Sequence, residues 1–93
     1  MGRKQGEANL AKHGVSFELA RRVWDDPNLE IASQWEGSEE RWLALGRVTL
    51  STILVVVHVY RRDGDEEEII RIISARKAIS HARRRYERQA FQS

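Results

Sequence analysis

The sequence contains no cysteine, which excludes disulfide bonds and thiolate metal sites. This composition is typical of the reducing cytoplasm, where we expect the protein to reside. The longest purely apolar run, Ile53–Val57, is far too short to cross a bilayer. The first ten residues, MGRKQGEANL, carry charge but no apolar segment, so we do not interpret them as a signal peptide. We therefore expect no association with a membrane.

Several signatures of enzymatic sites are also missing. The sequence has no glycine-rich phosphate loop and no Ser-His-Asp order. The three histidines, His13, His58 and His81, lie too far apart to form a local metal-binding motif. Any chemistry is therefore expected to need neither a metal nor another cofactor.

Charge is unevenly distributed, although the formal net charge is only +2. Acidic residues gather at Glu36–Glu40 and Asp63–Glu68. Basic residues gather near the C-terminus, as Arg76, Lys77, Arg83, Arg84, Arg85 and Arg88. Such a chain can present one positive face to phosphates. The alternative interpretation is an ordinary solvated helix face.

The 93 residues suffice for one small domain, which we expect to span residues 1–93. Glu7–His13 has the pattern of a short helix closed by Gly14. Ser16 is a suitable N-cap for a second helix, whose stripe of Phe17, Ala20 and Trp24 predicts a face toward the core. Asp25–Asn28 ends this helix, because the residue before a proline disfavours helical backbone.

Alternating and β-branched residues predict strands over 29–35, 41–48, 53–61 and 69–74. The run 53–61 has apolar residues on both faces, which suits a central strand, and Asp63-Gly64 indicates a hairpin after it. A last helix is expected from near Ala75, with Ser74 as its cap and an apolar stripe of Ala75, Ile79, Ala82, Tyr86 and Ala90. The fold class is therefore α+β: two N-terminal helices, an antiparallel sheet of about four strands and a C-terminal helix.

Arginines mark the strand ends. Arg61 ends the strand 53–61, and the returning strand carries Arg71 and then leads to Arg76. A cluster of arginines can hold a phosphate bidentately and stabilise charge that develops on it. The alternative is that these side chains are solvated or paired with the acids at 63–68.

Other side chains have both a functional and a structural interpretation. His58 interrupts an apolar strand and could accept a proton from a ribose hydroxyl, or be a core histidine satisfied by one hydrogen bond. His13 follows Lys12 at a helix end, where cations favourably meet the helix dipole. Tyr86 belongs to the apolar stripe but is surrounded by arginines. Trp42, next to Arg41, could stack on a base or pack in the core.

Six motifs resemble one family, the BrnT toxins of the RelE/ParE superfamily. They are KHGVSFELA at Lys12–Ala20, DDP at Asp25–Pro27, EERWLALG at Glu39–Gly46, VVVHVYR at Val55–Arg61, RIISARKA at Arg71–Ala78 and RRRYER at Arg83–Arg88. The resemblance spans about four-fifths of the chain, and the motifs occur in the family's order.

The resemblance implies a RelE-like fold and a ribonuclease toxin that inhibits translation by cutting RNA, free or on the ribosome. It implies a BrnA-type antitoxin as partner, which represses the operon through its own DNA-binding part, and an assembly that is a homodimer or a heterotetramer with the antitoxin. Ribonucleases of the superfamily work without metal: the ribose 2′-hydroxyl attacks the adjacent phosphate, giving a cyclic phosphate and a free 5′-hydroxyl.

The resemblance also implies site residues. Arg61 and Arg76 would stabilise the charge on phosphorus, and Tyr86 or His58 would transfer the proton. This interpretation requires Arg61 and Arg76 to meet in one solvent-open hollow. RNA-binding residues would be Lys12, His13, Arg41, Trp42, Arg71, Lys77, Arg83 and Arg84.

One departure from the family pattern concerns the N-terminus. BrnT chains usually begin with a short strand before the first helix, whereas MGRKQGEANL leads almost directly into that helix. We therefore expect a sheet with an open edge, which invites pairing with a partner or with a second copy.

Two other functions remain open at the level of sequence. The same fold could act by binding alone, as ParE-type relatives poison DNA gyrase. The face formed by Arg83–Arg88 could instead belong to a simple RNA-binding module that never cuts its ligand.

Overall fold

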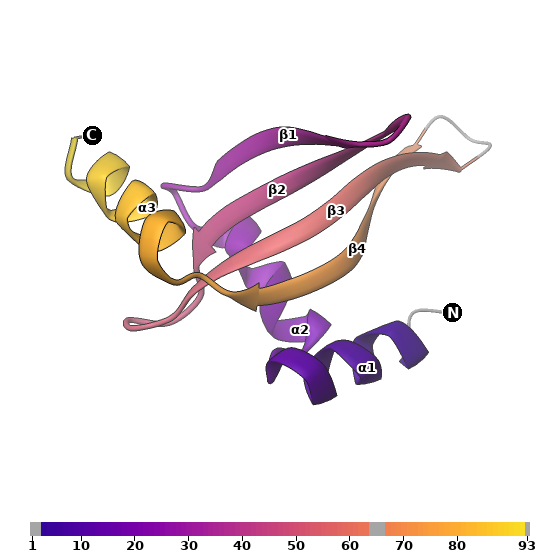
Figure 1. Ribbon diagram of the computed structural model, residues 1–93, viewed down its shortest axis with the longest axis horizontal. Helices are drawn as coiled ribbons and strands as arrows, with labels where there is room; N and C mark the ends of the chain where they lie inside the picture. The colour runs from indigo at the N-terminus through magenta and orange to yellow at the C-terminus, as the bar shows by residue number, and fades with distance from the viewer. Residues whose placement is uncertain (1–2, 64–66, 93) are drawn as a thin grey trace.

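A four-stranded antiparallel sheet forms the centre of the computed structural model, which describes residues 3–63 and 67–92 (Figure 1). Two short helices precede the sheet, and the second continues as a 3-10 helix. One longer helix follows the sheet. The elements are α1 (Arg3–His13), α2 (Phe17–Ala20), η1 (Arg21–Asp25), β1 (Glu30–Glu36), β2 (Glu39–Arg47), β3 (Ile53–Asp63), β4 (Glu67–Lys77) and α3 (Ser80–Gln92). The α+β class and the antiparallel sheet are confirmed.

The strands lie in the order β1-β2-β3-β4, so β3 is an inner strand as its two apolar faces predicted. Successive side chains of a strand point to opposite faces of the sheet. Leu54 and Val56 therefore face one layer, and Ile53 and Val55 face the other. The register of β3 and β4 shifts between Val57 and His58, which marks a β-bulge.

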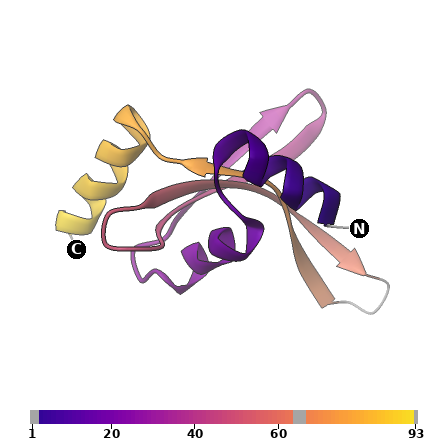
Figure 2. The same ribbon diagram turned by 90° about the horizontal axis from the view of Figure 1, so that it is seen from below.

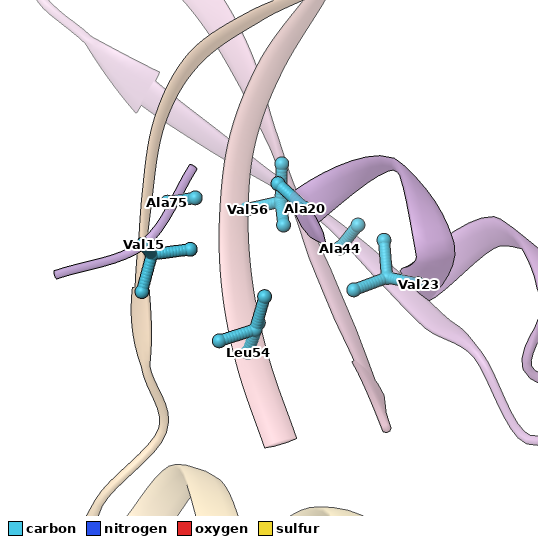
Figure 3. Close-up of a cluster of buried hydrophobic side chains, with 7 residues drawn as sticks. All are labelled: Val15, Ala20, Val23, Ala44, Leu54, Val56 and Ala75. Carbon is cyan, nitrogen blue, oxygen red and sulfur yellow. The ribbon is translucent and has the colours of Figure 1, made fainter. Parts of the chain in front are cut away.

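The larger core lies between the sheet and the N-terminal helices. Seven buried residues from the α1–α2 loop, α2, η1, β2, β3 and β4 form it, as Figure 3 shows: Val15, Ala20, Val23, Ala44, Leu54, Val56 and Ala75. Ser16 caps α2 as predicted, because its hydroxyl accepts a hydrogen bond of 3.1 Å from the Leu19 N–H. This core fixes η1 against β2.

The contact between η1 and β2 depends on a glycine. A Cβ atom at Gly46 would lie 2.8 Å from Val23 Cβ and 3.1 Å from Val23 Cα. We expect Gly46→Ala to lower the free energy of unfolding by about 1–3 kcal/mol, because the backbone of η1 must move. Thermal denaturation followed by circular dichroism measures this loss. The control is Gly6→Ala in α1, where the new Cβ meets only Phe17 at 3.6 Å. It should raise stability slightly, and equal melting temperatures for the two variants would contradict this account.

The smaller core lies on the opposite face, under α3. Leu45, Ile53 and Val55 of the sheet pack with Ala78 and Tyr86. Figure 2 shows α3 at one end of the sheet, away from the N-terminal helices. The sheet face beyond this end has no described helix over it.

The start of the last helix differs from the prediction. Ala75 lies in β4 opposite Val56, and β4 continues to Lys77, so Ser74 is a strand residue and not a helix cap. Helix α3 begins at Ser80, whose φ of +50° marks the change of direction after the strand. Ile79, predicted to be in the apolar stripe, is 75% exposed. Pairing with β3 outweighs the helical periodicity of this segment.

Other boundaries differ by a few residues. Helix α1 begins at Arg3, four residues before the predicted start, and the second helix changes to 3-10 geometry after Ala20. Strands β3 and β4 pair as the hairpin signal predicted, while Gly64 itself lies outside the described residues.

Candidate active site

A pocket of about 240 Å³ opens where α3 meets the sheet. Its floor is apolar and includes Leu45 and Val55, whereas its walls carry charge. The charged and titratable lining residues are Glu30 of β1, Arg76 of β4, and His81 and Arg85 of α3. A polar wall around an apolar floor is typical of ligand sites.

Strand register explains why these side chains meet. Glu30 lies opposite Leu45, and Arg76 lies opposite Val55, so both project to the face that α3 covers. His81 and Arg85 are four residues apart on α3 and therefore share one face of that helix. The pocket thus combines residues that are up to 55 positions apart.

Glu30 and Arg85 form the ion pair that ties α3 to β1. The Arg85 guanidinium contacts one carboxylate oxygen, Oε1, through Nε at 2.7 Å and Nη2 at 2.6 Å. The Glu30 side chain is only 13% exposed, and its other oxygen is buried without a hydrogen-bond partner in the described part of the chain. Glu30 therefore orients Arg85 at the edge of the pocket.

Tyr86 holds α3 from the other side. Its hydroxyl donates a hydrogen bond of 2.5 Å to Oδ2 of Asp26, and the same oxygen accepts from the Arg47 backbone N–H at 2.7 Å. The Arg47 guanidinium lies 5.6 Å from the centre of the Tyr86 ring. Tyr86 is buried, as its place in the apolar stripe predicted, and its hydroxyl is bonded inside the protein.

These contacts shift the pKa values of Tyr86 and Asp26. Burial, and next the bond to Asp26, raise the pKa of Tyr86. For Asp26, burial alone would raise the pKa. Hydrogen bonds from the Arg47 N–H, the Tyr86 hydroxyl and the Asn28 N–H outweigh burial and lower it. The proton therefore stays on Tyr86, which makes this side chain an anchor for α3 and a poor base.

His58 is fully buried on the opposite face of the sheet. Its ring meets Trp24 edge-to-face at 5.0 Å, and Nε2 lies 3.2 Å from the Tyr60 hydroxyl. Nδ1 lies 3.2 Å from the Val56 carbonyl. Burial lowers the pKa of His58, which keeps the imidazole neutral. This is the core-histidine alternative of the sequence analysis.

The lowered pKa of His58 predicts a loss of stability in mild acid. The ordinary pKa of histidine is 6.5, and below this pH His58 binds a proton in the unfolded chain but stays neutral in the folded protein. The free energy of unfolding therefore falls as the pH falls. Urea denaturation at pH 7.5, 6.5 and 5.5 measures this slope. His58→Phe, which keeps the aromatic packing, should flatten it. The same slope in both proteins would exclude His58 as its cause.

The structure does not bring Arg61 and Arg76 together. Arg76 pairs with Val55, six residues along β3 from Arg61. At about 3.4 Å per residue, the two arginines are separated by about 20 Å. Arg61 lies at the far end of the hairpin, where Arg71 is its diagonal neighbour because Arg71 pairs with Val59. Arg61 and Arg71 therefore occupy neighbouring positions on paired strands, but one hollow for Arg61 and Arg76 does not form.

The predicted RNA-binding residues are spread over both faces. Lys12 and His13 end α1 on the side of the N-terminal helices. Arg41 pairs with Glu36 at 2.7 Å, and Trp42 is half-buried, edge-to-face with Tyr60. Arg83 contacts Glu87 at 2.9 Å and the Ser51 carbonyl at 3.2 Å. The side chains of Arg71, Lys77 and Arg84 are exposed on β4 and α3.

The sequence showed no sign of Glu30 and assigned no role to His81, and it placed Arg85 only in the basic segment near the C-terminus. His81 and Arg85 have helical spacing beside an apolar stripe, a signal that would have placed them on one face. Nothing local marks Glu30, because its role depends on a helix 55 residues away.

Among residues 3–63 and 67–92, no three or more His, Cys, Asp and Glu side chains gather as metal ligands would. The helices of the same residues include none that is long and apolar enough to cross a membrane.

Comparison with known proteins identifies the family. Residues 3–81 match the family described as the ribonuclease toxin, BrnT, of a type II toxin-antitoxin system. A search of curated proteins found no match. The matched segment contains every strand of the sheet and three of the four charged or titratable pocket residues, Glu30, Arg76 and His81. This chain therefore belongs to the BrnT family of ribonuclease toxins from type II toxin–antitoxin systems.

Proposed function

We propose that this toxin cuts RNA in the pocket under α3 and that the reaction needs no metal ion. The observation that carries the proposal is the meeting of Arg76, Arg85 and His81 around an apolar floor. Two guanidinium groups can hold one phosphodiester, and an exposed imidazole beside them can exchange a proton.

The reaction would follow the course that the BrnT resemblance implies. His81 takes the proton of the ribose 2′-hydroxyl, and the freed oxygen attacks the adjacent phosphorus. Arg76 and Arg85 stabilise the charge that develops on the phosphoryl oxygens. The bond to the 5′-oxygen then breaks, that oxygen takes a proton from solvent at the open pocket, and a 2′,3′-cyclic phosphate remains.

In this proposal the other predicted catalytic residues have different roles. Arg61, about 20 Å from Arg76, and Arg71, about 17 Å from it along β4, bind the RNA backbone beyond the cut. Tyr86 positions α3 through Asp26, and His58 is a core residue. The burial of Tyr86 and His58 supports this assignment, because neither side chain is accessible to a substrate.

The family also bears on partners. A type II toxin has an antitoxin, and we propose that it is of the BrnA type, that the two form a heterotetramer in the cytoplasm, and that the toxin cuts RNA both free and on the ribosome. The sequence motifs that resemble BrnT support these points.

The test is cleavage of single-stranded RNA by the purified toxin in EDTA, with and without ribosomes. We expect fragments that end in a 2′,3′-cyclic phosphate and begin with a 5′-hydroxyl, which polynucleotide kinase labels without prior phosphatase treatment. Cleavage that stops in EDTA and returns with Mg²⁺ would refute the proposed mechanism. RNA binding with no cleavage under either condition would instead favour a binding module.

A further inference from the structure

We propose that the outer edge of β1 pairs antiparallel with β1 of a second copy of this chain. The two-fold axis passes through Ser33, at the middle of the seven-residue strand. The two four-stranded sheets then form one continuous sheet. This inference is independent of the proposed catalytic mechanism.

The outer edge of β1 is open within residues 3–63 and 67–92. There, β1 is the first strand in the sheet order, and β2 is the only strand that pairs with it. Figure 1 shows no described element along its outer side. In an antiparallel pair, every second residue directs its backbone N–H and C=O away from the partner strand. These outward groups of β1 are therefore available to another strand.

The opposite edge of the sheet is closed where α1 meets it. The Asn9 side chain donates to the Ala75 carbonyl at 2.8 Å and accepts from the Ala75 N–H at 3.0 Å. Asn9 thus occupies the N–H and C=O groups of Ala75, which a further strand would need at this position of β4. β1 has no comparable protection, because residues 31–35 include neither a charged side chain nor a proline.

The chosen register covers apolar surface that a monomer exposes. With the axis at Ser33, Ile31 lies opposite Trp35 of the second copy, and symmetry repeats this pair. Ile31 is 40% and Trp35 63% exposed in the single chain. Aromatic and β-branched residues are favourable partners across strands. A shift of two residues in either direction separates Ile31 from Trp35.

Charge does not oppose this register. It places Glu30 opposite Glu36 of the second copy, but each carboxylate already has an arginine of its own chain. Glu30 contacts Arg85 at 2.6 Å, and Glu36 contacts Arg41 at 2.7 Å. A seam of one strand pair is smaller than a standard interface, so we expect a dissociation constant on the order of micromolar.

The dimer would extend the RNA-binding face. A two-fold axis perpendicular to the sheet leaves both α3 pockets on the same face. Ala32 lines the pocket, and Gln34 of the second copy would lie opposite it in the paired strand. The second copy therefore adds a polar side chain beside the pocket wall. Only this consequence rests on the proposed function.

Cysteine cross-linking tests both the edge and the register, since the chain has no cysteine of its own. Ser33→Cys places two thiols opposite each other, with Cα atoms about 4.5–5.5 Å apart, within disulfide range. Gln34→Cys is the matched control, because Gln34 and its copy are diagonal neighbours about 7–8 Å apart. We expect rapid oxidation to a covalent dimer for Ser33→Cys alone. Equal cross-linking of the two variants, or none for Ser33→Cys, would overturn the proposal.

Sedimentation velocity tests the contact without a cross-link. From about 1 to 200 μM, the wild-type protein should pass from its 10.8 kDa monomer to twice that mass. Trp35→Lys should stay monomeric, because it places two charges in the seam. Leu50→Lys alters a residue that is 93% exposed in the turn between β2 and β3 and outside the proposed strand pair, and it should dimerise like wild type. A wild-type monomer throughout, or a dimer of Trp35→Lys, contradicts the proposal.

Discussion

Replacing Arg76 by alanine should lower the rate of RNA cleavage by about 10²–10³-fold, the usual effect of removing one donor to a developing oxyanion. Arg76 is an exposed residue near the end of β4, and it lines the pocket beside its apolar floor. Its guanidinium would bind the phosphoryl oxygens most strongly when they carry the most charge. Single-turnover cleavage of a short labelled RNA measures the effect.

Arg61→Ala is the matched control for Arg76→Ala. Arg61 is also an exposed arginine of the sheet but lies about 20 Å from Arg76 along the strands. We expect it to weaken RNA binding, with a reduced dependence on salt, and to leave the single-turnover rate at saturating RNA near that of wild type. If Arg61→Ala lowers that saturating rate as much as Arg76→Ala does, the cut is made elsewhere on the sheet.

Replacing His81 by alanine should lower the cleavage rate by about 10²–10⁴-fold, the range typical of a lost general acid or base. His81 is exposed at the first turn of α3, so its removal should leave the melting temperature nearly unchanged. The remaining activity should also lose the limb of the pH–rate profile that the imidazole causes. A profile with the same shape as wild type would show that another group transfers the proton.

Tyr86→Phe provides the contrast with His81→Ala. The variant keeps the buried ring but loses the hydroxyl that bonds to Asp26. We expect a loss of about 1.5–3 kcal/mol in the free energy of unfolding, as for other hydrogen bonds to a charged group. Cleavage at low temperature, where the variant is folded, should keep the pH–rate profile of wild type. A loss of one limb of that profile would assign the proton transfer to Tyr86 after all.

The sequence carried enough information for most of the sheet. The two apolar faces of Ile53–Val59 correctly predicted an inner strand, because both sides of such a strand must be buried. The start of α3 was not predictable in the same way. Ala75 fits the helical stripe, but its pairing with Val56 and the two bonds from Asn9 keep it in β4. These are long-range contacts, which periodicity does not encode.

The site was less predictable than the fold. The sequence identified Arg76 as a candidate but not the residues that lie beside it in the pocket. The length of β4 decides which end of the sheet Arg76 reaches. A hairpin brings Arg61 next to the returning strand at Ile69, and every further residue carries the chain away from Arg61. Glu30 and Arg85 come from segments that have no pattern in common, and only the docking of α3 brings them together.

The order of the elements has a consequence for the messenger RNA that encodes this toxin. The ribosome makes all four strands before it makes His81 and Arg85 of α3. A nascent chain that has reached residue 77 thus contains the floor of the pocket and Arg76 but lacks the opposite wall. In the proposed mechanism such a chain is inert toward the transcript being read. In this mechanism, a nascent toxin can cut the transcript that encodes it only after the ribosome has translated most of this domain.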